Sequence, residues 1–270
     1  MNILLLGGTG ILGTNLRKGL GQKFRIDFTY SKYNFEGGTK YCAGEDRINK
    51  LVKLKYDMII YNINPLELQY SEALFSIQDT VNYCEENNVH LVFISSVSAL
   101  PQNKLLNSYN LKKAISEDII LTEMKSKNFT IVRFTQLFDS EGLGKKSQPG
   151  LYYLLDSVKH NKPIQIFLNY EDCIRNYTPI EVAVNFIELI ILNNFKGIFN
   201  SYLDSFTFKF YDLLILLSSF NSRYDMYKMV SIGEVKGQNF FLESPSDELV
   251  SRLVVKKPIV DYFLEAYNNL

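Results

Sequence analysis

The most constraining feature of the sequence is an apolar run that leads without a break into three spaced glycines. Residues 1–13 read Met-Asn-Ile-Leu-Leu-Leu-Gly-Gly-Thr-Gly-Ile-Leu-Gly, and apolar side chains then recur at helical spacing up to residue 20. A buried strand joined to a helix by such a turn is a Rossmann βα unit, in which Gly7 permits the tight turn, Gly10 lets a pyrophosphate approach, and Gly13 lets the helix pack closely. The turn therefore predicts a site for NAD or NADP, built by Gly7, Thr9, Gly10, Ile11, Leu12 and Gly13.

Further along the chain, short apolar runs alternate with segments of helical period. The apolar runs lie at residues 3–6, 24–30, 58–63, 91–94 and 130–134, and the helical segments at residues 11–20, 73–87 and 108–125. Strands that alternate with helices form parallel βαβ units with right-handed crossovers. After about Asp139 the pattern loosens, with shorter helices and strands at residues 151–159, 164–168, 180–192 and 198–201. We predict an α/β fold, with a doubly wound parallel Rossmann sheet in residues 1–150. Residues 151–270 are expected to form a smaller α+β part that binds substrate and returns some elements to the first core.

The charge balance of the chain argues against large anionic partners. Lys and Arg together number 29, as do Asp and Glu, so no overall field attracts nucleic acid or an anionic membrane. The three cysteines are far apart and show no metal-binding spacing, which indicates reduced thiols and no metal site. No apolar run approaches the roughly 18 residues of a membrane span, and Met1 leads directly into a strand. We therefore expect a cytoplasmic protein.

The end of the second predicted strand bears on the choice between NAD and NADP. Enzymes that use NAD usually carry an acidic residue there, roughly 20 residues beyond the glycines, to bind the ribose hydroxyls. Here Asp27 lies early, inside the strand, which ends with Tyr30, Ser31 and Lys32. A hydroxyl followed by a cation suits the 2′-phosphate of NADP, so the sequence favours NADP and leaves NAD open. Asn62, near the end of the third apolar run, is a further candidate ligand of the cofactor.

A candidate catalytic group consists of Ser96, at the end of the fourth apolar run, and of Tyr109 and Lys113 on the next predicted helix. Side chains four residues apart share a face of a helix, so the phenol and the ammonium can act on one ligand. A tyrosine is a poor base at neutral pH, but a neighbouring ammonium favours the phenolate. Ser96 lies at the carboxyl end of a parallel strand, where such sheets bind ligands. The same spacing at Tyr224 and Lys228 follows neither a parallel strand nor a serine pair, and we assign it no role.

Together these motifs resemble the extended short-chain dehydrogenases/reductases of the NAD-dependent epimerase/dehydratase family, which modify sugars carried on nucleoside diphosphates. The resemblance covers most of the first 185 residues. It is carried by Gly7-Gly-Thr-Gly-Ile-Leu-Gly13, Phe93-Ile-Ser-Ser96, Tyr109-Asn-Leu-Lys-Lys113, Glu117, Val132-Arg133 and Arg175-Asn-Tyr-Thr-Pro-Ile180. It implies that Ser96 orients the substrate oxygen, that Tyr109 is the general acid/base, and that Lys113 binds the nicotinamide ribose and lowers the pKa of the phenol. It also implies that Arg175 contacts the diphosphate of the substrate.

Departures from the family pattern narrow the expected reaction. Residues 61–65 are larger than the small residues usual near the cofactor, and Leu137-Phe138-Asp139 replaces the frequent Tyr-Gly-Pro. Ser96 is followed by Val97 and Ser98, and not by the acidic pair with which 4,6-dehydratases eliminate water. We therefore expect a 4-keto-sugar reductase or an epimerase, working by hydride transfer on a nucleotide-linked sugar, in preference to a dehydratase.

Two other functions remain open. A dinucleotide-binding regulator or scaffold of the same fold would sense the cofactor without consuming it. A reductase for a non-sugar carbonyl would leave Arg175 without a diphosphate. The resemblance further implies a homodimer formed through the helix that bears Tyr109, whose apolar residues, which could equally face the sheet, are Leu111, Ala114, Ile115 and Ile119.

Overall fold

A computed structural model of the chain describes residues 1–32, 34–51, 55–64, 66, 68–100, 107–141, 148–168, 173–224, 229–234 and 247–270. Its centre is a seven-stranded sheet in which all neighbouring strands are parallel. From edge to edge the strands are β10 (Gly197–Asn200), β6 (Phe129–Phe134), β5 (His90–Ser96), β4 (Met58–Tyr61), β1 (Asn2–Leu6), β2 (Arg25–Tyr30) and β3 (Thr39–Lys40). The predicted Rossmann sheet is confirmed.

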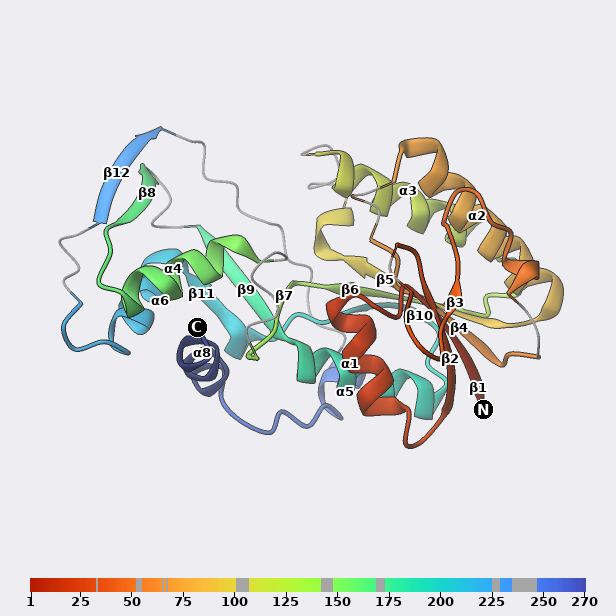
Figure 1. The fold of residues 1–270 in the computed structure, drawn as a ribbon. Coiled ribbons are helices and arrows are strands. Elements are labelled where there is room, and N and C mark those ends of the chain that lie inside the picture. Colours follow the sequence, from red (N-terminus) through yellow and green to blue (C-terminus); the bar gives the residue numbers. More distant parts are fainter. Residues whose placement is uncertain are drawn as a thin grey trace.

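Helices cover both faces of this sheet (Figure 1). On one face lie α1 (Ile11–Leu20) and α5 (Ile180–Asn193), and on the other lie α2 (Tyr70–Asn87) and α3 (Ser108–Glu123). Successive residues of a strand point to opposite faces, so Leu5 joins the core under α1 and α5 while Leu4 joins the core under α2 and α3. Because both faces are buried, the central strands are apolar throughout, which is why unbroken apolar runs locate them.

The order of the strands reverses between β1 and β4. From β1 the chain moves outward through β2 and β3, and from β4 it moves to the other edge through β5, β6 and β10. The carboxyl ends of β1 and β4 are adjacent, with Leu6 opposite Tyr61. Open parallel sheets bind ligands in the crevice at such a reversal. The glycine turn that follows β1 lies at this crevice.

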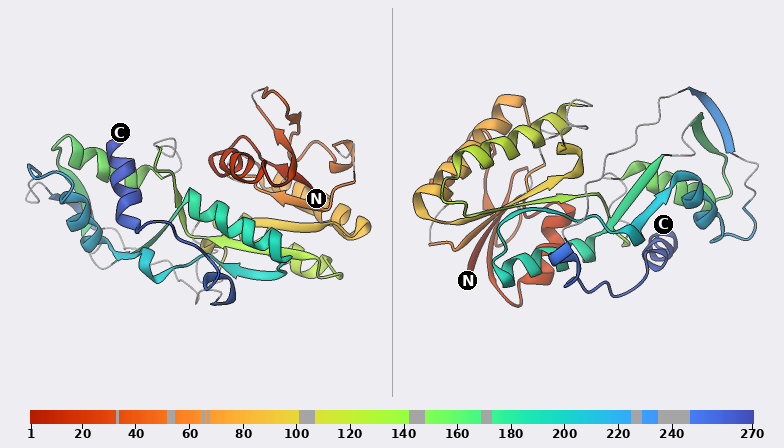
Figure 2. Two further views of the ribbon diagram at one scale, coloured as in Figure 1. Left: turned by 90° about the horizontal axis from the view of Figure 1, so that it is seen from below. Right: turned by 180° about the vertical axis from the view of Figure 1, so that it is seen from behind.

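A second part lies beside the sheet, and Figure 2 shows the two parts side by side from two directions. Its sheet elements are β7 (Gln136–Phe138), β9 (Ile174–Pro179) and β11 (Thr207–Lys209), together with the parallel pair β8 (Ile164–Leu168) and β12 (Met229–Glu234). Its helices are α4 (Pro149–Lys159), α6 (Phe210–Ser218) and α8 (Ile259–Asn268). Three later elements return to the first part, since β10 joins the central sheet, α5 covers it, and α7 (Asp247–Val250) packs on α5.

Two adjacent chain segments pass from one part to the other. β6 continues into β7 with only Thr135 between them, and β9 leads directly into α5 at Pro179. β7 and β9 are parallel neighbours, with Leu137 opposite Thr178. A hydrogen bond of 2.6 Å between the hydroxyls of Thr135 and Thr178 ties the two segments together.

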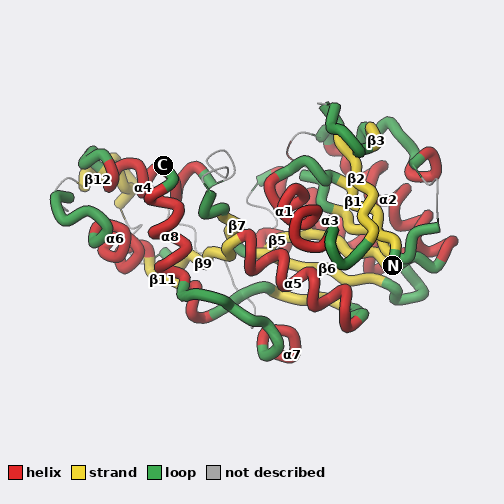
Figure 3. Tube along the Cα trace, turned by 60° about the horizontal axis from the view of Figure 1, so that its bottom comes forward, coloured by secondary structure: helices red, strands yellow, loops and turns green. Residues whose placement is uncertain are grey.

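Aromatic side chains form much of the core of the second part. Phe138 stacks on Phe263 with ring centroids 5.0 Å apart, and Tyr177 and Phe208 pack on Phe263 at 5.6 and 5.8 Å. Figure 3 shows α4, α6 and α8 gathered here, at the end of the molecule away from the N-terminus. The aromatic stretch at residues 206–211 ends a short 3-10 turn at Phe206 and then forms β11 and the start of α6.

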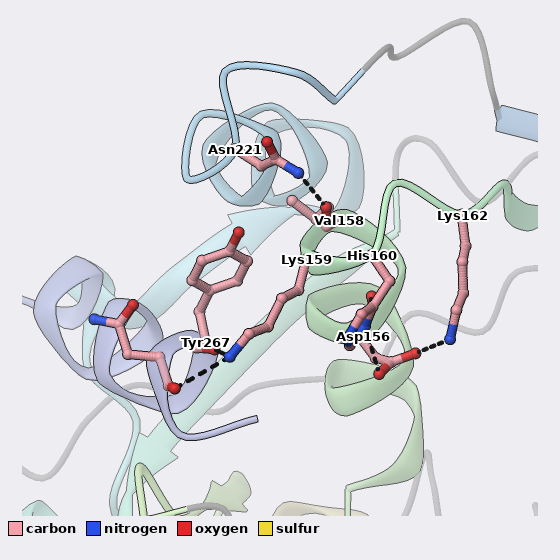
Figure 4. A network of polar contacts seen from close by, with 8 residues as sticks. Asp156, Val158, Lys159, His160, Lys162, Asn221 and Tyr267 are labelled. Carbon is pink, nitrogen blue, oxygen red and sulfur yellow. Dashed lines mark hydrogen bonds and ion pairs between the residues drawn. The ribbon is translucent and has the colours of Figure 1, made fainter.

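Polar side chains fix the C-terminal helix α8 against α4 (Figure 4). Lys159 Nζ donates hydrogen bonds to the carbonyl oxygens of Tyr267, at 2.9 Å, and Asn268, at 3.1 Å. Next to this contact, the amide of Asn221, just after α6, donates to the Val158 carbonyl oxygen of α4 at 2.7 Å and ties α6 to α4. The last carbonyl groups of a helix lack intrahelical partners, so a lysine is favourable at this position.

Several observed element ends differ from the predicted ones by a few residues. α2 begins at Tyr70 and not at residue 73, because Gln69 and Glu72 form a capping box at its start. α3 ends at Glu123 and not at residue 125, since Met124 leaves the helical conformation. β4 ends at Tyr61, two residues before the predicted end. The glycines at positions 142 and 144 lie outside the described residues.

Candidate active site

The glycine turn after β1 is held by groups from the ends of β2 and β4. Gly7 has a φ of +77°, a conformation that favours glycine, and a Cβ there would lie 2.6 Å from the Asn62 carbonyl oxygen. The Gly7 N–H donates to Thr29 Oγ1 at 3.1 Å, and the Gly8 N–H donates to the Thr29 carbonyl oxygen at 3.0 Å. The Asn62 amide donates to the Gly7 carbonyl oxygen at 3.1 Å. The structure thus brings the predicted residues Gly7 and Asn62 into direct contact.

The start of α1 directs backbone N–H groups towards the same place. A Cβ on Gly13 would lie 2.3 Å from the Gly7 carbonyl oxygen, so the helix lies directly on the turn. Gly10 is the N-cap, with no side-chain cap from the described residues and no acidic residue in the first turn. The first N–H groups of a helix lack intrahelical partners and attract anions. Thr9 and Gly10 are exposed and Ile11 is half-buried, whereas the buried Leu12 has only its backbone to offer a ligand.

Thr29, and not Asp27, faces the glycine turn from β2. The Asp27 carboxylate accepts a hydrogen bond of 2.8 Å from the Tyr56 hydroxyl, and burial together with this carboxylate raises the pKa of Tyr56. Ser31 and Lys32 follow Thr29 and are exposed. No motif of the sequence indicated a role for Thr29, whose buried hydroxyl supports the turn by accepting a hydrogen bond from the Gly7 N–H. The available signal was its place near the end of the second strand, 22 residues beyond Gly7.

Ser96, Tyr109 and Lys113 come together at the carboxyl end of β5. Ser96 Oγ accepts a hydrogen bond of 3.2 Å from the Ser98 N–H, and the Ser96 side chain is close enough to the Tyr109 phenol to lower its pKa. Lys113 Nζ donates to the Ile94 carbonyl oxygen at 2.6 Å. Strand β5 therefore contacts both the phenol and the ammonium within three residues of its end.

Burial changes the pKa of both groups on α3. It raises the pKa of the Tyr109 phenol above the ordinary value, and the Ser96 side chain opposes this rise. It lowers the pKa of the Lys113 ammonium to about 7, against the opposing effect of the Glu117 carboxylate. Lys113 is therefore partly neutral near pH 7. A negative charge that approaches Lys113 would raise this pKa and favour the ammonium.

A buried ion pair supports α3 one turn beyond Lys113. Arg133 of β6 donates to Glu117 Oε2 from Nη2 at 2.7 Å and from Nε at 3.1 Å. The Ser95 hydroxyl donates to Glu117 Oε1. Removal of one member of a buried pair leaves an uncompensated charge, so the pair fixes α3 against β5 and β6. The ion pair therefore holds in place the helix that carries Tyr109 and Lys113.

Arg175 lies in the second part, on β9. This strand pairs with β7, where Gln136 is opposite Tyr177, and β7 continues the line of β6. The Arg175 side chain is buried, and its Nη1 donates to the Ile174 carbonyl oxygen at 2.8 Å. Arg175, which the sequence predicts to bind the diphosphate, thus lies on a strand next to β7, and β7 continues β6 of the central sheet.

His90 lies at the opposite end of β5 from Ser96. Its Nε2 lies 2.8 Å from Thr130 Oγ1, and its Nδ1 lies 3.1 Å from Asn194 Oδ1. Burial lowers its pKa to about 4, so the imidazole is neutral at pH 7. His90 therefore has a structural role at the amino end of the sheet.

The described residues also bear on the other chemical groups considered in the sequence. Among the described residues, no group of His, Cys, Asp and Glu side chains is arranged to hold a metal ion. No helix in the described ranges is both long and apolar enough to cross a membrane. The three cysteines are free thiols. The second Tyr-x-x-x-Lys match cannot be placed, because Lys228 lies outside the described residues, as do Glu171 and Asp172.

Comparison with known proteins identifies the fold by structure alone. The sequence matches no protein-family model and no curated protein. The UDP-glucose 4-epimerase of Thermus thermophilus in complex with NAD matches with a TM-score of 0.76 and 14% identity, over 100% of this chain and 98% of that one. The dTDP-glucose 4,6-dehydratase of Bacillus anthracis in complex with NAD matches with a TM-score of 0.79 and 11% identity, over 100% and 96%.

A third solved structure is named for another reaction of nucleotide sugars. A hypothetical dTDP-4-dehydrorhamnose reductase from Sulfolobus tokodaii matches with a TM-score of 0.73 and 17% identity, over 97% of this chain and 99% of that one. Similar folds thus carry the names of an epimerase, a dehydratase and a reductase, so the fold does not select among these reactions. The resemblance seen in the sequence is confirmed at the level of the fold. The chain shares, over its length, the fold of enzymes of the NAD-dependent epimerase/dehydratase type.

Proposed function

We propose that the protein is an NAD(P)-dependent oxidoreductase or epimerase acting on a nucleotide-linked sugar. The observation that carries the proposal is the meeting of Ser96, Tyr109 and Lys113 at the carboxyl end of β5. β5 is the neighbour of β4, so this group lies one strand away from the crevice at the glycine turn. The first 150 residues would bind the cofactor, and residues 151–270, with Arg175 among them, would bind the nucleotide part of the substrate.

In the proposed reaction, residues of the chain bind the reacting sugar oxygen and move its proton. The Tyr109 phenol exchanges a proton with the sugar hydroxyl that becomes a carbonyl, and the Ser96 hydroxyl binds the same oxygen. The Lys113 ammonium, four residues along the helix, stabilises the phenolate. A bound NAD or NADP would accept or donate the hydride of the sugar carbon at its nicotinamide ring. Because Val97 and Ser98 carry no carboxylate, a reductase or epimerase is favoured over a dehydratase.

The decisive experiment is a Tyr109→Phe variant assayed for NADPH oxidation with a panel of keto-sugar nucleotides and for epimerisation of sugar nucleotides. Turnover is expected to fall roughly 100- to 10,000-fold while cofactor affinity is kept, because general acid/base catalysis supplies that factor. Tyr41→Phe is a matched control, since Tyr41 is also buried and hydrogen-bonds to Ser76 at 3.3 Å, outside the site. Unchanged turnover in Tyr109→Phe would remove the phenol from the mechanism.

The same assays separate the alternatives. Tight binding of cofactor with neither turnover of any carbonyl compound nor epimerisation of any sugar nucleotide would identify a regulator or scaffold. Turnover of simple ketones but of no nucleotide-linked sugar would identify a reductase for non-sugar carbonyls. Either result would contradict the proposed substrate class.

We further propose that the cofactor site prefers NADP. The exposed residues directly after β2, where an acid would bind the ribose hydroxyls, are Ser31 and Lys32, and they bring no negative charge against a 2′-phosphate. These residues offer the 2′-phosphate a hydroxyl and a cation. Ser31→Asp is expected to shift the ratio of the two dissociation constants towards NADH by about tenfold or more. Ser31→Thr keeps the hydroxyl and is the control, and tighter binding of NADH than of NADPH by the unmodified protein would contradict the preference.

We also propose a homodimer formed through α3. Leu111 and Ile115 are half-exposed on this helix, whereas Ala114 is buried and Ile119 packs on the core. Sedimentation equilibrium of the unmodified protein is expected to give twice the mass of the chain. Ile115→Lys is expected to give a folded monomer, and a monomeric unmodified protein would contradict the proposal.

A further inference from the structure

Ser98 follows Ser96, the candidate catalytic serine, by two residues. A short 3-10 turn, Val97–Ala99, begins directly after β5, and Ser96 caps it by accepting a hydrogen bond from the Ser98 N–H at 3.2 Å. This turn packs against α3, which carries Tyr109, and against the end of β6. The turn therefore holds Ser98 next to the residues that would bind a substrate oxygen.

The Ser98 hydroxyl is buried, with 5% of the residue exposed, and it has no hydrogen-bonding partner among the residues that the structure describes. The neighbouring serine hydroxyls are both engaged, since Ser95 donates to Glu117 and Ser96 accepts from the Ser98 N–H. A buried hydroxyl without a partner destabilises a folded protein, and nearly all such groups in native structures are satisfied. The Ser98 hydroxyl is thus a polar group that a ligand would satisfy.

We infer that Ser98 binds a second hydroxyl of the sugar, next to the oxygen held by Ser96 and Tyr109. This inference rests on the proposed function of the same site. A serine hydroxyl donates one hydrogen bond and accepts others, which suits a neutral sugar hydroxyl. Ser98 orients the sugar ring and takes no part in proton transfer. A site built to pair with a substrate hydroxyl discriminates strongly against a ligand that lacks it, so Ser98 contributes to specificity.

The test measures ligand binding and thermal stability in a Ser98→Ala variant. UDP-glucose, dTDP-glucose, UDP and dTDP are titrated by calorimetry against protein saturated with NADPH. The variant is expected to bind the sugar nucleotide about tenfold more weakly, as for the loss of one hydrogen bond, and to bind the parent nucleotide unchanged. Its Tm is expected to stay the same or to rise, because the removed hydroxyl has no partner among the described residues of the free protein.

Ser76→Ala is the matched control. Ser76 is also buried, but its hydroxyl bonds to Tyr61 at 3.0 Å and to Tyr41 at 3.3 Å. This control is expected to lower the Tm and to leave sugar-nucleotide binding unchanged. The opposite signs of the two stability changes separate a ligand-binding serine from a structural one.

Three results with the Ser98→Ala variant would overturn the inference. They are a Tm lowered as in the control, an affinity for the sugar nucleotide equal to that of the unmodified protein, and an equal loss of affinity for the nucleotide without the sugar. In each case the unmodified protein still binds the sugar nucleotide, so the proposed function stands. If the unmodified protein binds neither UDP-glucose nor dTDP-glucose, the substrate class is wrong and the role of Ser98 fails with it.

Discussion

The two parts of the molecule hold their key groups by different means. In the first part, the glycine turn is fixed by hydrogen bonds that link Thr29 and Asn62 to backbone atoms of Gly7, where a side chain would collide with the backbone. In the second part, rings packed around Phe263 form much of the core, and Lys159 holds the last helix. A site made from backbone fixes one ligand geometry. A region made from side chains can change shape by replacement of individual residues.

The largest expected effect is on the aromatic core. Phe263→Ala removes a fully buried ring and is expected to lower the free energy of unfolding by about 3–5 kcal/mol. Affinity of the folded protein for the cofactor should be kept if the two ends are independent. Urea unfolding and a cofactor titration measure the two quantities, with the partly exposed Leu264→Ala on the same helix as the control. If Phe263→Ala lowered the affinity for the cofactor as well as the free energy of unfolding, the two parts would not be independent.

Acid is expected to weaken the first part through His90. Burial lowers the pKa of this imidazole from 6.5 to about 4, so the unfolded chain binds a proton that the folded chain excludes. The neutral His90 therefore contributes fully to the free energy of unfolding above pH 6.5. This contribution, on the order of 3 kcal/mol, is lost as the pH falls towards 4. Unfolding free energies measured from pH 7 to pH 4 should fall less steeply in His90→Asn. Parallel curves for the two proteins would contradict the assignment.

A pair of glycine substitutions sharpens the same comparison. Gly7→Ala forces a side chain into a left-handed conformation and into the Asn62 carbonyl, and is expected to cost about 1–3 kcal/mol and most of the cofactor affinity. Gly150→Ala, in the second part, meets no atom within 4 Å and is expected to be neutral or slightly stabilising. Thermal unfolding and NADPH titration of both variants provide the measurement. Equal tolerance at the two positions would refute the contrast.

The smallest expected effect concerns the tie between α4 and α8. Lys159→Met removes the donor to the carbonyl oxygens of Tyr267 and Asn268, and is expected to cost about 1 kcal/mol. Lys162→Met removes an exposed pair with Asp156 and is expected to cost less than this. Hydrogen exchange of the α8 amides should quicken in the first variant only. Equal exchange rates in both would show that Lys159 does not hold the helix.

The sequence predicts the central sheet well, because strands buried on both faces are unbroken apolar runs. It also predicts the glycine turn, because that conformation requires glycine. It does not reveal Thr29, since a threonine at the end of a strand is common for reasons of β propensity alone. The bond from Asn62 to Gly7 depends on β4 lying beside β1, which becomes visible only when the strands are paired.

The second part is less visible in the sequence. β9 contains Arg175, Asn176 and Thr178, and β11 has three residues, so neither gives an apolar run or a regular alternation. These strands form because each pairs with a neighbour that is distant in sequence. The surroundings of the Ser98 hydroxyl are likewise invisible in the sequence, which shows the residue but not what packs around it.

The single residue between β6 and β7 has a mechanical consequence. A rotation of the three-stranded sheet about Thr135 would displace the carboxyl end of β6, where Phe134 is the register neighbour of Ser96 on β5. The hydrogen bond between the hydroxyls of Thr135 and Thr178 joins the two connecting segments, so such a rotation would involve both of them. Under the proposed function, a substrate nucleotide held by the second part would thus be coupled mechanically to the strand next to Ser96.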